Sequence, residues 1–286
     1  MPLTPNKLSS IDESIIEPYQ HIHQLNGYTL PKARGKEPVT IFKYMPLDRF
    51  ISNLEKGVFV FVSPALWKDP FERMYHNVDC SAHGYRTEEI ACLCVSEKSS
   101  TNEEASWKVY SVNGEKVVRL SIDLYLLLGM LDDFAKKNHC EVYIGKAQYG
   151  YEKKEIMNLY KPGSSHFGLF FPPVMERKHY LSVMTLKRSA FEYENELRVF
   201  LVGDNIPFDK KLVEINCDYE SSKLVKDIVL CPYPVLPTDK DLVHSVRAKM
   251  NRLESDELKK TLKKLVGCRV RQSRLYESGK RVEKIL

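Results

Sequence analysis

Three charged side chains alternate with apolar ones in the stretch FEYENELRVF, residues 191–200. Glu194, Glu196 and Arg198 stand two positions apart, and a β-strand places such residues on one face, about 7 Å from each other. Neighbouring carboxylates repel, so either the pKa of one is raised or the guanidinium keeps both ionised. Such a row could hold a ribose diol or activate a hydroxyl group. The competing interpretation is the solvent-exposed face of a strand.

Two other groups of residues have types that suit ligand binding. Lys43 lies inside an apolar strand pattern, FKY, where a lysine costs desolvation energy unless it meets an acid or an anion. Trp107 and Tyr110 are three positions apart on a predicted helix and therefore share a face. The lysine could equally lie on the solvent side of an edge strand, and the aromatic pair is also typical of a core. Both interpretations stay open from the sequence.

The elements that must position these residues form an irregular mixture of strands and helices. Apolar runs rich in β-formers predict several strands, and amphipathic periodicity predicts several helices between them. The predicted strands include 39–44, 58–62, 88–97, 116–123, 141–149 and 193–202, and the predicted helices include 46–57, 124–138, 238–253 and 255–267. This pattern lacks strict βαβ alternation and predicts an α+β fold. We expect a single domain with a mixed, mainly antiparallel β-sheet and flanking helices.

Composition along the chain suggests three parts. Residues 1–36 are polar and predict a lightly packed N-terminal arm. Residues 37–246 form the predicted core domain, with an insertion at about 150–180 that is rich in Gly, Pro and Ser. Residues 247–286 form a predicted basic, helical C-terminal extension.

The net charge of +5 is concentrated in that extension. Residues 247–286 hold 13 Lys and Arg against 5 Asp and Glu, a surplus of +8, so the other 246 residues carry −3. A basic tail on a mildly acidic body favours an anionic partner, either nucleic acid or an acidic protein. The alternative is a solvated helix rich in lysine.

Several classes of protein do not fit the sequence. No apolar run approaches the length that spans a bilayer, and the N-terminus lacks the pattern of a secretory signal, so we expect a cytoplasmic protein without membrane contact. The 7 cysteines are scattered and odd in number, which favours reduced thiols. No HExxH or CxxC motif is present, and we predict no metal site.

Five short motifs occur in an order that resembles an uncharacterised bacterial family, the one catalogued as domain of unknown function 2971. The motifs are IFKY (41–44), SPALWKDPFE (63–72), ACLCVSE (91–97), WKVY (107–110) and KRSAFEYENELR (187–198). Together they cover about residues 39–235. The chain departs from the family pattern at three places: Lys68 replaces an Asn, Phe191 replaces a Trp, and NGEK (113–116) matches the usual H-K-G only loosely.

The order of elements also resembles, more loosely, the layout of ADP-ribosyltransferase-like domains. This resemblance implies an enzyme that breaks the nicotinamide–ribose bond of NAD, its substrate, in a bacterial toxin or antiphage effector. It implies that Glu196 contacts the ribose 2′-hydroxyl and that Glu194 orients or deprotonates the acceptor. The implied residues for binding the dinucleotide are Lys43, Tyr44, Ser63, Trp107, Tyr110 and Arg198.

Two other functions remain open at this point. A metal-dependent nuclease could hold Mg²⁺ through Asp69, Glu194 and Glu196 while the basic tail 247–286 holds nucleic acid. Arg198 beside the two glutamates disfavours a bound cation. A module without catalysis could instead use the basic tail to bind nucleic acid or a partner protein, such as an antitoxin.

Overall fold

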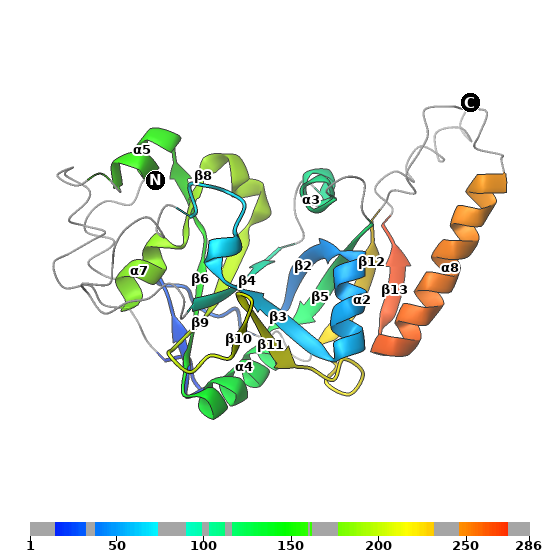
Figure 1. The fold of residues 1–286 in the computed structure, drawn as a ribbon, viewed down its shortest axis with the longest axis horizontal. Coiled ribbons are helices and arrows are strands. Elements are labelled where there is room, and N and C mark those ends of the chain that lie inside the picture. The colour runs from blue at the N-terminus through cyan, green and yellow to red at the C-terminus, as the bar shows by residue number, and fades with distance from the viewer. Residues whose placement is uncertain are drawn as a thin grey trace. The chain divides into compact units, whose positions relative to one another are not determined.

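The computed structural model describes residues 15–32, 38–73, 90–98, 103–111, 116–159, 161, 177–231 and 246–273. These residues belong to two compact units, each assembled from separate segments of the chain. The first unit draws on residues 1–39, 59–97 and 127–215, and the second on residues 40–58, 98–126 and 216–286. Figure 1 shows the elements of both.

The first unit is built on strands that run mainly antiparallel. Strand β9 (Glu196–Val202) pairs antiparallel with β4 (Ile90–Ser96) on one side and with β6 (Glu141–Lys146) on the other. Strand β3 (Val58–Val62) pairs with β4 and with β11 (Leu212–Asn216), which pairs with β10 (Phe208–Asp209). All seven residues of β9 are buried, as expected for a central strand covered on both faces.

Part of the predicted N-terminal arm belongs to this sheet. Strand β1 (Ile22–Gln24) runs parallel to β6, and His23 stands opposite Tyr143. The side chains of Ile22 and Leu25 have no exposed surface. This part of the predicted arm is therefore anchored on the core, where Ile16 and Tyr28 are buried as well.

Short elements complete the first unit beside the sheet (Figure 1). A parallel pair of strands, β7 (Gln148–Tyr151) and β8 (Leu186–Arg188), leads into the 3-10 helix η6 (Ser189–Glu194). The other helices are η1 (Pro64–Leu66), α4 (Leu124–Asn138), which begins in the second unit, α5 (Lys153–Leu159) and α7 (Arg177–Val183). Most of the predicted insertion at 150–180 lies outside the described residues.

The second unit has its own run of paired strands. Strand β5 (Val117–Asp123) pairs antiparallel with β2 (Thr40–Pro46) and with β12 (Val225–Leu230), and β13 (Arg269–Gln272) runs parallel to β12. Its helices are α2 (Leu47–Lys56), α3 (Glu103–Tyr110) and α8 (Val246–Val266). Helix α2 ends at Gly57, whose φ of 63° is a left-handed cap that glycine adopts without strain.

The predicted pair of helices at 238–253 and 255–267 is wrong. Helix α8 continues through Ser255 up to Val266, and Gly267 ends it with φ 66°. Ser255 followed by two acids is a typical helix start, but no Gly or Pro precedes it, so the helical backbone continues. Residues 238–245 lie outside the described part of the chain.

The predicted fold class is confirmed: the protein is α+β, with a mixed, mainly antiparallel sheet architecture and flanking helices. Across the ranges that the structure describes, no helix is both long and apolar enough to cross a membrane.

Candidate functional site

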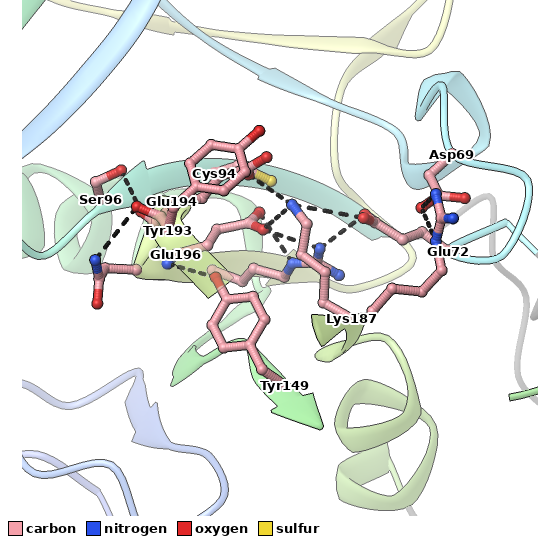
Figure 2. Close-up of polar contacts among 12 residues, drawn as sticks. Asp69, Glu72, Cys94, Ser96, Tyr149, Lys187, Tyr193, Glu194 and Glu196 are labelled. Carbon is pink, nitrogen blue, oxygen red and sulfur yellow. Dashed lines mark hydrogen bonds and ion pairs between the residues drawn. The ribbon is translucent and has the colours of Figure 1, made fainter. Parts of the chain in front are cut away.

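The charged stretch 193–198 is not the continuous strand that its alternation predicts. Glu194 is the last residue of η6, Asn195 turns the chain with φ 44°, and Glu196 opens β9. Asparagine tolerates this left-handed conformation better than most residues. The turn breaks the expected row. Arg198 pairs with Glu196, and both Glu194 and Glu196 pair with a shared lysine (Figure 2).

That lysine is Lys187, from β8. Its Nζ atom lies 2.6 Å from Glu196 Oε2, 2.7 Å from Glu194 Oε2 and 3.5 Å from Glu72 Oε1. Figure 2 shows Lys187 reaching between Glu72 and the other two glutamates. The side chain of Lys187 is only 8% exposed, so these are strong ion pairs shielded from water.

Arg198 supplies the second cation and has no exposed surface. Its Nε atom donates to Glu196 Oε1 at 3.0 Å, and its two terminal nitrogens donate to Glu196, to Glu72 Oε2 at 2.7 Å and to the carbonyl of Met184. The guanidinium also lies 4.3 Å from the ring centroid of Trp67, within the range of a cation–π contact. We call Glu72, Lys187, Glu194, Glu196 and Arg198 the carboxylate cluster.

Three carboxylates share two cations, so the carboxylate cluster carries one negative charge when every group is ionised. Burial alone would raise the pKa of Glu196, but Arg198 and Lys187 together lower it below its usual range. Burial raises the pKa of Glu194, and Lys187 only partly offsets this while Glu196 adds to it. Glu194, the most exposed of the three carboxylates, is therefore held less firmly in its ionised form than Glu196.

The shift at Glu194 predicts a pH-dependent gain in stability for Glu194→Gln. A carboxyl whose pKa is raised by folding destabilises the fold when it is ionised, that is, as the pH rises through the folded-state value. Glutamine cannot ionise, so we expect Glu194→Gln to unfold at higher urea than wild type near pH 7.5 and at equal urea near pH 4. Glu192→Gln, on the exposed side of η6, is the control and should change neither value. Equal destabilisation at both pH values would contradict the prediction.

Hydrogen bonds hold the backbone around Glu194 and Glu196 in place. The hydroxyl of Tyr149 accepts the N–H of Glu196 at 2.9 Å, and Ser96 Oγ donates to the carbonyl of Glu194 at 2.7 Å. The thiol of Cys94 also hydrogen-bonds the side chain of Glu196. Burial and a hydrogen bond with Cys92 raise the pKa of the Cys94 thiol, the hydrogen bond being the larger cause, so it stays protonated as a donor.

A second charged group lies next to the carboxylate cluster. Arg188, the neighbour of Lys187 in β8, donates to Asp69 Oδ2 from Nε at 3.1 Å and from a terminal nitrogen at 2.8 Å. Its guanidinium carbon lies 4.9 Å from the ring centroids of both Phe71 and Phe191. Lys153 Nζ lies 5.4 Å from the Phe71 centroid. We call Asp69, Phe71, Lys153, Arg188 and Phe191 the Arg188 group.

The predicted binding residues divide between the two units. Ser63, in the first unit, is 4% exposed and caps η1, because its Oγ accepts the N–H of Ala65 at 3.3 Å. The other predicted contacts, apart from Arg198, lie in the second unit: Lys43 and Tyr44 in β2, and Trp107 and Tyr110 in α3.

Three of these second-unit residues form an aromatic cluster. Tyr44 meets Trp107 edge-on at 5.0 Å and stacks on Tyr110 at 5.9 Å, and Trp107 has no exposed surface. The burial of Trp107 agrees with the alternative that Trp107 and Tyr110 pack in a core. Lys43 is half-buried in β2, opposite Leu120.

The sequence did not predict two members of the carboxylate cluster, Lys187 and Glu72. Both were visible as ends of quoted motifs, since Lys187 opens KRSAFEYENELR and Glu72 closes SPALWKDPFE. Their spacing gave no reason to join them, because 126 residues separate Glu72 from Arg198 along the chain.

The basic C-terminal segment is described only in part. Within α8 and β13, residues 258–273 contain four Lys and two Arg but no Asp or Glu, and Lys260, Lys263, Lys264 and Arg269 are exposed. Lys259 pairs with Asp256 and Arg271 with Asp227. Contact of this segment with nucleic acid or a protein stays a prediction.

No protein-family model matches the chain. The search of curated proteins likewise finds no match. Membership of the family with domain of unknown function 2971 therefore stays a prediction.

The described residues also bear on metal binding. Among them, no three or more His, Cys, Asp or Glu side chains are grouped so that they could hold a metal ion. The three acids proposed for a nuclease belong to different ion pairs. Asp69 pairs with Arg188, while Glu194 and Glu196 pair with Lys187.

Proposed function

We propose that the first unit carries the active site of an NAD-consuming enzyme, ADP-ribosyltransferase-like or NAD-hydrolysing, with Glu194 as its acid–base residue. One observation carries the proposal: a partly exposed carboxylate with a raised pKa stands at the edge of a buried ionic cluster. Such perturbed carboxylates are typical of catalytic sites, because a general acid or base works best with a pKa near the working pH.

The structure supports different roles for the two glutamates than the resemblance implies. Glu196 is 5% exposed, and both of its carboxylate oxygens accept hydrogen bonds from Arg198 or Lys187. It therefore acts as a positioning residue rather than as a substrate contact. Glu194 is 15% exposed and is held at one oxygen, Oε2, by Lys187. Its other oxygen is the one we assign to the substrate.

The proposed reaction needs a negative site beside the ribose. The bond between ribose C1′ and the nicotinamide nitrogen breaks, its electron pair leaves with nicotinamide, and the ribose becomes an oxocarbenium-like cation. The net negative charge of the carboxylate cluster stabilises that cation. Water or an acceptor nucleophile then forms the new bond to C1′, and its proton passes to the carboxylate of Glu194. The products of hydrolysis are nicotinamide, ADP-ribose and that proton.

The proposed biological setting follows from the family resemblance and not from the geometry. A bacterial toxin or antiphage effector would use this chemistry either to deplete NAD or to modify a macromolecule. The second choice requires an acceptor, and an anionic partner bound by the basic tail is the candidate that the charge distribution favours.

The test is release of nicotinamide from NAD by the purified full-length chain, measured by chromatography. We expect Glu194→Gln to lower the rate by about 10²- to 10⁴-fold, the usual contribution of a general acid or base. Glu192→Gln is the matched control, because Glu192 lies two residues away on the same 3-10 helix and is exposed. Its rate should equal that of wild type.

Glu196→Gln separates positioning from catalysis. It removes one of the two counter-charges of Arg198, so we expect lost activity together with a lower melting temperature, whereas Glu194→Gln keeps its fold. The proposal is wrong if wild type leaves NAD intact with water, protein and nucleic-acid acceptors alike, or if Glu194→Gln turns NAD over at the wild-type rate.

A further inference from the structure

Two consecutive residues of β8 lie in different surroundings. Lys187 is 8% exposed and belongs to the carboxylate cluster, whereas Arg188 is 30% exposed and belongs to the Arg188 group. Successive strand residues point to opposite sides of the strand. The short element β8 therefore links a buried ionic cluster to a partly exposed cationic and aromatic surface.

The Arg188 group combines features that recognise a phosphate. A guanidinium has five N–H groups, and Arg188 directs two of them to Asp69. Within the described part of the chain, the other three have no hydrogen-bond partner. Lys153 adds a second, exposed cation beside Phe71. Asp69 balances one of these two charges, so the group carries a net charge of +1 that suits an anion.

The same group offers aromatic surface. Phe71 and Phe191 are both partly exposed, and each ring lies 4.9 Å from the Arg188 guanidinium carbon. A planar heterocycle gains from stacking on an aromatic ring, and a neighbouring arginine adds to that gain. Partly exposed aromatic rings in a group with a net positive charge thus fit a ligand that carries both a ring and a phosphate.

Lys187 connects this surface to Glu194. Its Nζ atom lies 5.2 Å from the Phe191 ring centroid and 2.7 Å from Glu194 Oε2. A ligand ring placed against Phe191 is therefore one side chain away from the carboxylate that we assign to catalysis.

We propose that Phe71, Arg188 and Phe191, with Lys153 beside them, form a nucleotide subsite that takes the aromatic ring and a phosphate of the substrate. The assignment rests on the proposed NAD chemistry for its substrate class and goes beyond it in naming the binding surface. Phe191 and Lys153 are specificity-determining residues in this scheme, for the ring and for the phosphate respectively.

Calorimetric titration with two stable probes tests the subsite. ADP-ribose carries a ring and phosphates, and ribose 5-phosphate carries a phosphate without a ring. We expect Phe191→Leu to weaken ADP-ribose binding at least about fivefold, the lower end for loss of one stacked base, and to leave ribose 5-phosphate unchanged. Lys153→Gln should weaken both probes, and Lys154→Gln, its exposed neighbour on α5, should weaken neither.

Three outcomes overturn the subsite. Wild type could bind neither probe at millimolar concentration, or Phe191→Leu could bind both as wild type does. Alternatively, Phe71→Leu and Phe191→Leu could lower the melting temperature with affinity unchanged, in which case the Arg188 group only fastens the 63–73 segment to η6.

Glu194→Gln distinguishes failure of this inference from failure of the proposed function. It should lose NAD turnover, whereas any ADP-ribose binding that remains should still be weakened by adding Phe191→Leu. Probe binding that needs Phe191, without any NAD cleavage by wild type, keeps the subsite and rejects the reaction. NAD cleavage with a KM that Phe191→Leu leaves unchanged rejects the subsite and keeps the reaction.

Discussion

Arg198→Met is expected to lower the free energy of unfolding by about 3–5 kcal/mol, because it leaves three largely buried carboxylates with Lys187 as their one remaining counter-charge. Arg198 has no exposed surface and pairs with both Glu196 and Glu72. Methionine matches the length of the aliphatic stem but offers no N–H group, so the carboxylate cluster would hold three acids and one cation. Urea unfolding at neutral pH, followed by circular dichroism, measures the loss.

A matched control separates burial from charge as the cause. Lys146 pairs with Glu97 at 2.7 Å, but its side chain is 56% exposed. Lys146→Met should therefore cost no more than about 1 kcal/mol, as exposed ion pairs do. The double variant Arg198→Met with Glu196→Gln removes one charge of each sign and should recover part of the loss. If Arg198→Met costs no more than Lys146→Met, the carboxylate cluster does not stabilise the fold.

Trp107→Ala is expected to cost a similar amount, about 3–5 kcal/mol, through packing rather than charge. Trp107 is fully buried in a cluster with Tyr44, Val117, Val229 and Cys231. Its removal leaves a cavity that these neighbours cannot close. The measurement is again urea unfolding, with retention of the folded baseline as the check that the variant folds.

Trp107→Phe is the control for this second prediction. The indole N–H is buried without a hydrogen-bond partner among the described residues, so a phenyl ring loses no polar contact. We expect Trp107→Phe to cost clearly less than Trp107→Ala. A role as a ligand platform would show the reverse pattern, with stability kept in both variants and nucleotide affinity lost in both.

The local pattern of residues determined most of the elements. The apolar run VFVFV and the periodicity of 124–138 predict β3 and α4 at the places where they occur, because side-chain burial on a strand or helix face depends on neighbours in the chain. The spacing of Glu194, Glu196 and Arg198 also pointed to three residues that ion pairs connect, Glu194 and Glu196 to Lys187 and Arg198 to Glu196.

Tertiary structure alone decided what those charges do. The alternation in 193–198 is compatible with an exposed strand, but the left-handed turn at Asn195 and the central position of β9 bury it instead. Burial of charge requires partners, and these came from distant segments, Glu72 and Lys187. In the second unit, burial of apolar surface places Trp107 in the core and packs the partly buried Tyr110 against it. Desolvation depends on everything that surrounds a side chain, and no spacing along the chain contains that information.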